Sequence, residues 1–458
     1  MLQSRESQIV RRIGERRIRR ALNHASDTRE FVIGPGVLSR LPPLCAAHFP
    51  GRKILLVADA NTFKAAGERT FQILAAAGIP LVEPLIFPGR PMLSPDYVHV
   101  ERLRDRLRKT DAAAAAVGSG TINDLLKRAS FEAGRGYLIV ATAASMDGYS
   151  SFGAALLLNG FKKTLECPAP RVIVADVSVL RGAPPHMSAA GYADLLGKIT
   201  AGADWKTADA LSVEPIDPLS WRLSQPRLRR WVGRPEGVPR GDEAVSRDVF
   251  EGLTMTGFAM QALRSSRPAS GTEHLFSHIW EMQHLEYRGI PVSHGFKVAL
   301  GTLAAAALME VLFADELGAS DVERACSIWP DSADREREVR DALEGTPIVE
   351  QAVDTCLAKH SGVETLRRRL LKASRMWALL RRRVQRQLLP FDQLRDMLQA
   401  AGCPVRPEHI GLDRERLEGT FRLAQMIRPR YTVLDLAYET GRLRECTDHI
   451  FSSKRYFP

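Results

Sequence analysis

Five short, almost continuously apolar runs constrain the fold of this chain more than any other feature. They are KILLVAD (53–59), LVEPLIF (81–87), AAAAAV (112–117), YLIVAT (137–142) and RVIVAD (171–176). Apolar runs of this length without polar alternation are typical of strands that are buried on both faces of a sheet. Helix-like stretches at 62–77, 97–109 and 121–132 separate them. This alternation predicts an α/β domain with a parallel, doubly wound, Rossmann-like sheet.

The sequence changes character near RGAPPHM at 181–187. Beyond it the strand signals stop, and Leu/Ala/Arg-rich helical periodicity runs to the C-terminus. We therefore expect a basic extension at 1–28, a Rossmann-like domain at 29–185 and an all-helical domain at 186–458. The polar, Pro/Gly-rich segment at 225–243 is expected to be a loop within the helical domain.

The composition is that of a soluble globular protein. The 458 residues are 45% hydrophobic and 26% charged, which is enough chain for two domains with ordinary cores. The six cysteines are scattered without a CxxC pair, and no secretory signal is recognisable, so we expect a reducing cytoplasm and no disulfides. No apolar stretch approaches the roughly 20 residues that a membrane-spanning helix needs, and we predict no transmembrane segment.

The chain is basic, with a formal net charge of +11 and arginine-rich segments at 11–20, 101–110 and 364–389. Such an excess can attract phosphorylated metabolites, anionic lipid or nucleic acid. Acidic residues are interleaved with the arginines, and no aromatic stacking pattern accompanies them. We interpret these segments as solvated helix faces and expect no nucleic-acid partner.

Two polar turns follow predicted strands. The run at 112–117 leads into VGSGTINDLLKRAS, which places Gly118 and Gly120 at a strand-to-helix turn. Glycines there let the backbone approach a diphosphate, and the helix N-terminus favours its negative charge. TAASMDGYSS (142–151) forms the second turn on the same edge of the sheet. Asp59 ends the first strand, where it is either a ribose partner or the cap of the next helix.

Histidines and a carboxylate in the helical part suggest a metal site. His274 and His278 are one helical turn apart in TEHLFSHIWEM, and His294 begins another apolar helix. Asp194 and Lys198 lie four residues apart in GYADLLGKITAGADW, either as a surface ion pair or as part of an active site. Asp194 with His274 and His294 matches a divalent metal site with an open position.

With these residues in view, the chain resembles the bacterial glycerol-1-phosphate dehydrogenases, relatives of iron-containing alcohol dehydrogenases, glycerol dehydrogenase and dehydroquinate synthase. The resemblance runs from about residue 30 to about residue 450. It is carried, in order, by GSGTIND, TAASMDGYSSFGAALLLNGFKKT, AGYADLLGKITAGADW, SRPASGTEHLFSH and MIRPRYTVLDLAYETG. It implies a Rossmann-like nucleotide domain followed by an all-helical metal and substrate domain.

The resemblance also implies the site residues. The metal ligands are Asp194, His274 and His294, which would hold one divalent ion of zinc, nickel or iron. The substrate-contacting residues are Asp147, Asp194 and His278. With Gly118 added from the turn described above, the nucleotide-contacting residues are Asp59, Gly118, Gly120, Thr121, Ile122, Asn123, Asp124, Thr142, Ala143, Ala144, Ser145 and Ser151.

The family reaction is the reversible reduction of dihydroxyacetone phosphate to sn-glycerol 1-phosphate by NADH or NADPH, and a homodimer is expected. A metal ion would stabilise the developing alkoxide. We assign His278 as the proton donor, and Lys198 either to the substrate phosphate or to the ligand carboxylate. Asp59 as a ribose partner would repel a 2′-phosphate, which favours NAD, with NADP as the alternative.

Three other functions fit the same residues. The first is a sugar-phosphate cyclase of the dehydroquinate synthase type, which would consume no net NADH. The second is another polyol dehydrogenase without phosphate specificity. The third is a basic protein that binds nucleic acid or a membrane surface, for which salt-dependent binding without turnover would be the sign.

Overall fold

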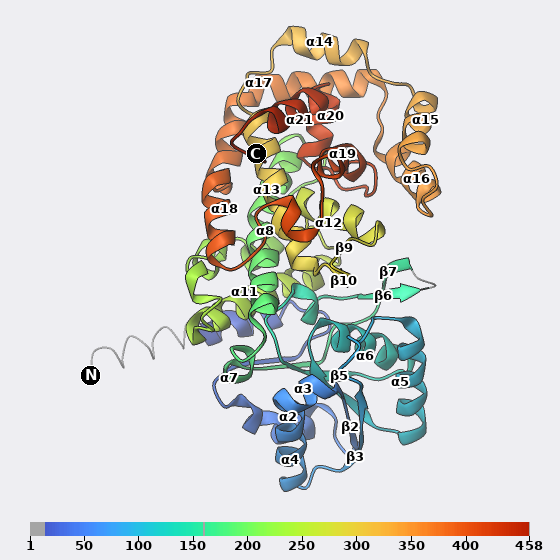
Figure 1. Ribbon diagram of the computed structural model, residues 1–458, viewed down its shortest axis with the longest axis vertical. Coiled ribbons are helices and arrows are strands. Elements are labelled where there is room, and N and C mark those ends of the chain that lie inside the picture. Colours follow the sequence, from blue (N-terminus) through green and yellow to red (C-terminus); the bar gives the residue numbers. More distant parts are fainter. Residues whose placement is uncertain (1–13, 159–160, 458) are drawn as a thin grey trace, which may run out of the picture. The chain divides into compact units, whose positions relative to one another are not determined.

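The computed structural model describes residues 14–158 and 161–457 (Figure 1). The chain divides into two compact units. One comprises Met1–Leu195 and Pro218–Ala269, and the other comprises Leu196–Asp217 and Ser270–Pro458. The division falls inside an uninterrupted helix, α8 (Pro185–Ala210). The functional boundary near residue 185 stays a prediction.

A parallel sheet forms the centre of the first unit. Its six strands, counted over the described residues, lie in the order β1-β8-β5-β4-β2-β3. The bounds are β1 (Glu30–Gly34), β2 (Ile54–Asp59), β3 (Leu81–Phe87), β4 (Ala113–Gly118), β5 (Tyr137–Ala141) and β8 (Val172–Asp176). The five predicted apolar runs are β2, β3, β4, β5 and β8, which confirms the doubly wound α/β fold class. The edge strand β1 was not predicted, because EFVIG is short and only partly buried.

The inner strands β2, β4, β5 and β8 are buried on both faces, as their unbroken apolar runs predict. The expectation is wrong for the edge strand β3, which is partly buried and exposes Glu83 and Ile86. Alternate strand residues such as Leu56 and Ala115 pack in one cluster with Leu41 and Leu44 of a helix. The intervening residues, such as Leu55, are also buried. The helices of this unit are α2 (Leu41–His48), α3 (Ala60–Thr62), α4 (Glu68–Ala76), α5 (Tyr97–Thr110), α6 (Gly120–Glu132), α7 (Val177–Leu180), α9 (Pro218–Ser224), α10 (Leu228–Trp231) and α11 (Glu243–Leu263).

Two parts of the first unit differ from the sequence expectation. A hairpin of β6 (Ala154–Leu158) and β7 (Phe161–Leu165) follows the second polar turn and was not predicted. The segment at 225–243, expected as a loop, contains α10 and the 3-10 turn Pro235–Gly237. Leu228 and Trp231 bury their side chains, and this burial stabilises a short helix despite the polar composition. Of the basic extension, residues 14–22 are helical and residues 1–13 lie outside the described part.

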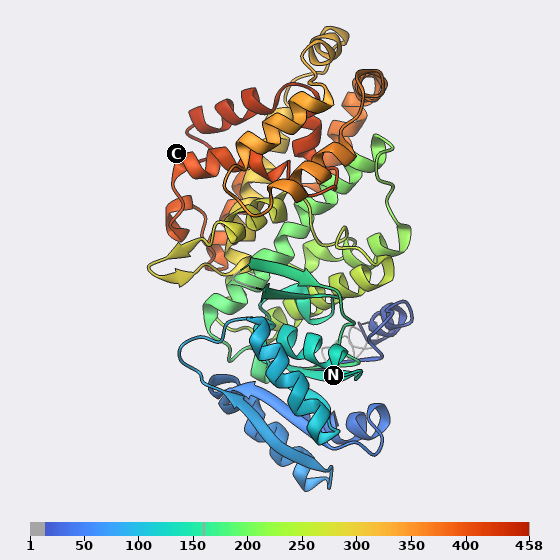
Figure 2. The same ribbon diagram turned by 90° about the vertical axis from the view of Figure 1, so that its right-hand side faces the viewer.

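The second unit is almost entirely helical (Figures 1 and 2). Its helices are α12 (Thr272–Met282), α13 (His294–Leu312), α14 (Ala319–Ser327), α15 (Ser332–Ala342), α16 (Val349–Lys359), α17 (Val363–Gln387), α18 (Phe391–Ala400), α19 (Arg414–Ala424), α20 (Val433–Glu439) and α21 (Leu443–Ser452). A two-stranded ribbon of β9 (Glu286–Tyr287) and β10 (Ile290–Pro291) interrupts them, so the strands do not stop completely after residue 186.

Helix α13 corrects the expectation that no segment is long and apolar enough to cross a membrane. By length and composition His294–Leu312 passes that test. However, 83% of its most apolar window is buried inside the protein, as in the core helix of a globular fold. The apolar character of α13 is therefore explained by core packing.

Surface charge and cysteines agree with ordinary globular packing. The arginine-rich helix α17 forms ion pairs with other elements, including Arg381 with Glu316 at 2.8 Å and Arg367 with Glu323 at 3.1 Å. The six cysteines are all buried and free.

Candidate functional site

Two helices of the second unit carry the predicted histidines. Gly271 immediately precedes α12, which places His274 in its first turn. Ser293 caps α13 by accepting a hydrogen bond from the Phe296 N–H, so His294 is the first residue of that helix. The rings of His274 and His294 lie 5.2 Å apart between centroids, and those of His274 and His278 lie 6.4 Å apart. The position of His294 at the start of α13 and the one-turn spacing of His274 and His278 on α12 therefore bring three imidazole rings close together.

The three predicted metal ligands come together. Asp194 lies on α8, next to the point where that continuous helix passes into the second unit. The candidate ligand atoms of Asp194, His274 and His294 all lie within 4.8 Å of one another. Asp194 and His274 are buried, and His294 is partly exposed. One carboxylate and two imidazoles form a donor set suited to a divalent transition metal.

Each ligand histidine is oriented by its own glutamate. The Nδ1 atom of His274 lies 2.8 Å from Oε1 of Glu273, and the Nδ1 atom of His294 lies 3.0 Å from Oε1 of Glu281. A carboxylate accepts a hydrogen bond from Nδ1–H, which assigns the tautomer and leaves Nε2 to bind a metal. The arrangement of both histidines therefore fits a metal ion.

Glu273 is the more deeply fixed of the two glutamates. Its side chain is fully buried, and it accepts hydrogen bonds from the Gly271 N–H at 2.7 Å and the Thr200 hydroxyl at 2.8 Å. Burial alone would raise the pKa of Glu273. The hydrogen bond and charge of His274, together with the Gly271 N–H, outweigh that effect and hold the pKa below its ordinary value. Glu273 is therefore an anion beside His274.

Glycines allow the helices around these histidines to pack closely. A Cβ added to Gly301 of α13 would lie 2.3 Å from the backbone oxygen of Glu273. A Cβ added to Gly197 of α8 would lie 2.9 Å from Val298 and 3.2 Å from Cγ of Glu273. Only a residue without a side chain permits these approaches.

His278 lies beside the ligand cluster and shares Glu281 with it. Its Nδ1 atom is 3.4 Å from Oε2 of Glu281. Burial is the largest cause that lowers the pKa of His278, and the charge of Arg428 lowers it further. The imidazole is therefore neutral at physiological pH, with Arg428 close enough to affect it. Lys198, one turn after Asp194 on α8, is fully buried.

Asp147 contacts a metal-ligand candidate through its backbone. It begins the short 3-10 turn Asp147–Tyr149, and its N–H donates to Oδ2 of Asp194 over 2.9 Å. Gly191, on the same helix as Asp194, lies against the segment that precedes Asp147, because a Cβ at Gly191 would be 1.8 Å from the backbone oxygen of Ala144. Helix α8 is therefore packed directly on the segment that holds Thr142, Ala143, Ala144 and Ser145.

The predicted nucleotide turn has the expected form. Strand β4 ends at Gly118, which pairs with Ala141 at the end of β5, and α6 begins at Gly120. A Cβ on Gly118 would lie 2.6 Å from Ile122, and one on Gly120 would lie 2.5 Å from Met146. Packing therefore requires a glycine at 118, whereas at 120 the flexible end of Met146 could move aside, and the turn leaves a helix N-terminus at the carboxyl edge of the sheet.

Several predicted nucleotide residues have structural roles of their own. Asp59 caps α3 by accepting from the N–H groups of Asn61 at 2.8 Å and Thr62 at 2.9 Å, so the capping alternative is observed. Asn123 and Asp124 are buried, and Oδ2 of Asp124 accepts from the Ala155 N–H at 3.1 Å. Contact of these residues, and of Thr121, Ile122 and Ser151, with a nucleotide stays a prediction.

Four residues of interest could not be picked out from the sequence. Glu273 and Glu281 orient the ligand histidines, Arg428 lies near His278, and Lys127 binds the segment that follows Asp147. The signals were present but weak. Glu273 directly precedes His274, and Arg428 lies within MIRPRYTVLDLAYETG, one of the segments that carry the family resemblance.

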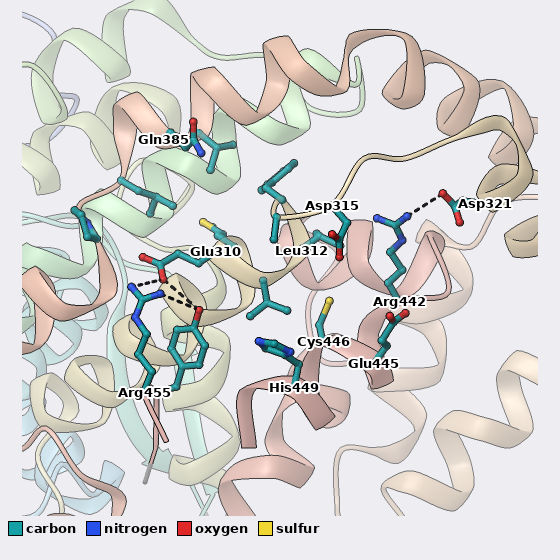
Figure 3. Close-up of a pocket in the computed structure, with 18 of the residues that line it drawn as sticks. Glu310, Leu312, Asp315, Asp321, Gln385, Arg442, Glu445, Cys446, His449 and Arg455 are labelled. Carbon is teal, nitrogen blue, oxygen red and sulfur yellow. Dashed lines mark hydrogen bonds and ion pairs between the residues drawn. The ribbon is translucent and has the colours of Figure 1, made fainter. Parts of the chain in front are cut away.

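A cavity of about 750 Å³ lies elsewhere in the second unit, around the C-terminal end of α13 (Figure 3). Two ion pairs form between residues that line the cavity, Arg455 with Glu310 at 3.0 Å and Arg442 with Asp321 at 2.9 Å. None of the described residues that line it is a predicted site residue. Because its charges largely neutralise one another, the cavity gives no indication of a phosphorylated ligand.

Known proteins resemble this chain in sequence. The family model "Iron-containing alcohol dehydrogenase" matches residues 32–184. The glycerol-1-phosphate dehydrogenase [NAD(P)+] of Bacillus velezensis is 37% identical over 53% of this chain, and the match spans 62% of that relative. The Bacillus subtilis protein of the same name is 30% identical over 85% of this chain and 86% of its own length.

The fold of this chain is also similar to that of proteins whose structures have been solved. An iron-containing alcohol dehydrogenase from Thermococcus thioreducens matches with a TM-score of 0.57 over 93% of this chain and 99% of that one, at 17% identity. At this identity the likeness describes the fold alone. With the sequence match over most of the Bacillus subtilis protein, it leads to one assignment: this chain belongs to the glycerol-1-phosphate dehydrogenase family, within the iron-containing alcohol dehydrogenase fold.

Proposed function

We propose that this protein is a metal-dependent, NAD(P)H-linked dehydrogenase that reversibly reduces dihydroxyacetone phosphate to sn-glycerol 1-phosphate. The observation that carries the proposal is the cluster of Asp194, His274 and His294 in a chain whose relatives bear this activity in their names. When bound, the metal supplies a Lewis acid for the ketone oxygen, and the nicotinamide supplies the hydride.

The residues of the chain hold and orient the reacting groups. Asp194, His274 and His294 bind the metal ion, and Glu273 and Glu281 fix the two imidazoles. Asp147 contacts the substrate, and its N–H restrains one oxygen of Asp194. This leaves the other carboxylate oxygen for the metal.

His278 moves the proton. Because its imidazole is neutral, it accepts the hydroxyl proton during alcohol oxidation. In the reductive direction the neutral imidazole holds no proton at Nε2, so Nε2 takes one from solvent and passes it to the alkoxide oxygen, directly or through water. Glu281 accepts from its Nδ1–H, so Nε2 is the atom that exchanges the proton.

Two cations are candidates for the substrate phosphate. Arg428 is exposed and carries a guanidinium that can bind phosphate through two parallel hydrogen bonds. Lys198 is fully buried, which favours its alternative role of steadying the Asp194 carboxylate. We assign the phosphate to Arg428. Its replacement by alanine should raise the KM for dihydroxyacetone phosphate and leave NADH binding unchanged.

The first unit supplies the nucleotide site at the turns after β4 and β5. Strand register supports this, because Val57 pairs with Ala116 and Gly118 pairs with Ala141, so these strands end at one edge. The α6 N-terminus would bind the diphosphate, and Asp59 would bind a ribose and favour NAD. We further propose that residues 29–185 act as the nucleotide domain and 186–458 as the metal and substrate domain, in a cytoplasmic homodimer.

The test is NADH oxidation by metal-reconstituted protein with dihydroxyacetone phosphate. Controls omit the metal with a chelator or replace the substrate with dihydroxyacetone. Turnover that requires both metal and phosphate is expected. Turnover with dihydroxyacetone alone, or no net NADH consumption with any of zinc, nickel or iron, would overturn the proposal.

An Asp194→Asn variant tests the metal site itself. It should lose metal binding and turnover while it keeps the melting temperature of the apoprotein. Asp209→Asn, on the same helix, is the matched control and should behave as the wild type. An Asp194→Asn variant with wild-type metal affinity would contradict the ligand assignment.

A further inference from the structure

Lys127 is a buried lysine for which the proposed reaction has no use. It lies in α6, seven residues after Gly120 at the start of that helix, and its side chain has no solvent exposure. Lysine is rarely buried unless its ammonium is fully paired. The partners of Lys127 therefore indicate what the residue does.

The ammonium of Lys127 is surrounded by backbone carbonyl groups. Its Nζ donates to the oxygens of Gly148 at 2.8 Å, Ser151 at 3.1 Å and Gly153 at 2.9 Å. Oδ1 of Asp124 lies 3.4 Å away on the same helix. Three N–H donors thus meet three carbonyl acceptors, and the carboxylate compensates the charge.

These carbonyls belong to the segment Asp147–Gly153, which connects the predicted nucleotide and metal residues. Asn123 reinforces the same attachment, because its Nδ2 donates to the Gly148 oxygen at 3.2 Å. The segment begins with Asp147, whose N–H donates to Asp194, and it contains Ser151. Lys127 therefore connects the helix of the nucleotide turn, through residues Asp147 and Gly148, to the carboxylate of a metal-ligand candidate.

A cation is needed at this point for a physical reason. The three carbonyl oxygens converge on one position, and without a positive charge their dipoles repel one another in a medium of low dielectric constant. A side chain that donates no hydrogen bond would take the Lys127 donor from the Ser151 and Gly153 oxygens and leave the Gly148 oxygen to Asn123 and the Ser151 hydroxyl. The segment would then move to find other partners, and Asp147 and Ser151 would move with it.

We propose that Lys127 is a positioning residue, a built-in cation that fixes the segment Asp147–Gly153 against α6 and so sets the geometry of both the nucleotide and the Asp194 side of the site. The inference rests on the proposed function for its catalytic consequence. The cation site itself stands on the contacts of Lys127 alone. A further consequence is that removal of the side chain creates a site for a small alkylammonium ion.

The experiment uses three variants of the full-length protein. Lys127→Ala removes Cγ, Cδ, Cε and Nζ, which n-propylammonium would replace. Lys127→Met keeps the volume of the side chain but has no charge, so added amine finds no space. Lys53→Ala removes an exposed lysine just before β2 and is the matched control.

Each variant is measured for thermal melting, NADH affinity by fluorescence titration, and kcat and KM. Without amine, Lys127→Ala should bind NADH about tenfold more weakly. Its kcat/KM should fall about 100-fold, as expected when reacting groups are displaced by about 1 Å. n-Propylammonium chloride should restore melting temperature and NADH affinity with saturation. Tetramethylammonium, which donates no hydrogen bond, should not, and Lys127→Met should respond to neither salt.

An absence of amine rescue would overturn the inference, and so would either of two further results. One is a Lys127→Ala protein with NADH affinity and kcat/KM equal to those of Lys53→Ala. The other is a defect that n-propylammonium and tetramethylammonium restore equally, since that would be an ionic-strength effect. If Lys127→Ala does not fold without amine, Lys127→Gln replaces it, and weaker NADH binding by this neutral, polar variant is the expected result.

Failure of the proposed reaction can be distinguished from failure of the Lys127 cation site. A wild-type protein that oxidises no NADH with dihydroxyacetone phosphate contradicts the reaction but leaves the melting and NADH titrations intact. Amine-dependent melting of Lys127→Ala would then still support the built-in cation. Absence of that dependence would refute the cation site whatever the reaction is.

Discussion

Glu273→Gln isolates the effect of one negative charge on the metal site. The glutamate is fully buried and binds three donors, Nδ1 of His274, the Gly271 N–H and the Thr200 hydroxyl. Glutamine keeps one oxygen, which serves both His274 and Gly271. Its amide replaces the oxygen that faces Thr200, whose hydroxyl can turn its hydrogen to the Gly197 oxygen at 2.8 Å and accept from the amide. The change therefore removes the charge and preserves the shape.

The expected effect follows from the role of the carboxylate. Because the pKa of Glu273 is lowered, the wild-type group is an anion, and it makes the His274 imidazole a stronger donor to a metal. Loss of such an outer carboxylate weakens metal binding about 10- to 100-fold. At about 1.4 kcal/mol per tenfold change, this corresponds to about 1.4 to 2.8 kcal/mol. The apoprotein should lose only about 1 kcal/mol, the difference between a charged and a neutral hydrogen bond.

The assay is competition for zinc with a chromophoric chelator, alongside denaturant unfolding of the apoprotein. Glu286→Gln, on the exposed β9 strand, is the control for the same chemical change and should bind zinc as the wild type does. A Glu273→Gln protein with the zinc affinity of the control would refute the argument. So would a loss of affinity that is matched by an equal loss of apoprotein stability.

Three further predictions concern packing and cofactor choice. Gly191→Ala should destabilise the fold by about 1–3 kcal/mol and weaken NADH binding in fluorescence titration, because the new methyl group would overlap the Ala144 carbonyl. Gly301→Ala should cost a similar amount in denaturant unfolding and also weaken zinc binding, since it pushes on the backbone of Glu273. Asp59→Asn should keep the helix cap, hence its melting temperature, and raise kcat/KM for NADPH relative to NADH.

The central sheet could be predicted because a strand that is buried on both faces needs an apolar residue at nearly every position, and such runs are visible in the sequence. Strands β2, β4, β5 and β8 are flanked by other strands and consist almost entirely of apolar residues. The edge strand β1 pairs on one side only and is partly exposed, so its five residues carry no unbroken apolar run. Strand β3, at the other edge, is also only partly buried, but its seven residues are mostly apolar and it was predicted. Prediction therefore failed for the edge strand that is both short and mixed.

The ligand cluster could be proposed because its residues are of types that bind metals and recur in a recognisable order. The residues that orient them lack this property. Glu281 follows His278 by three positions and looks like an ordinary charge on a helix surface, yet it lies between two histidines and near Lys297 at 3.4 Å. Lys127 similarly looks like one more surface lysine of an amphipathic helix. Their roles depend on tertiary contacts that spacing alone does not show.

The three metal-ligand candidates share one design. Each side chain has two atoms that could bind a metal, and one of the two is hydrogen-bonded to the protein. Asp194 accepts from the Asp147 N–H, His274 is bonded to Glu273, and His294 is bonded to Glu281. The remaining atom of each is thereby oriented before a metal arrives, which reduces the entropy cost of binding. The same logic explains why Asp194→Asn is expected to fail even when folded. Its single oxygen cannot satisfy the Asp147 N–H and a metal ion as two carboxylate oxygens do, and the amide that takes the other position is not a metal ligand.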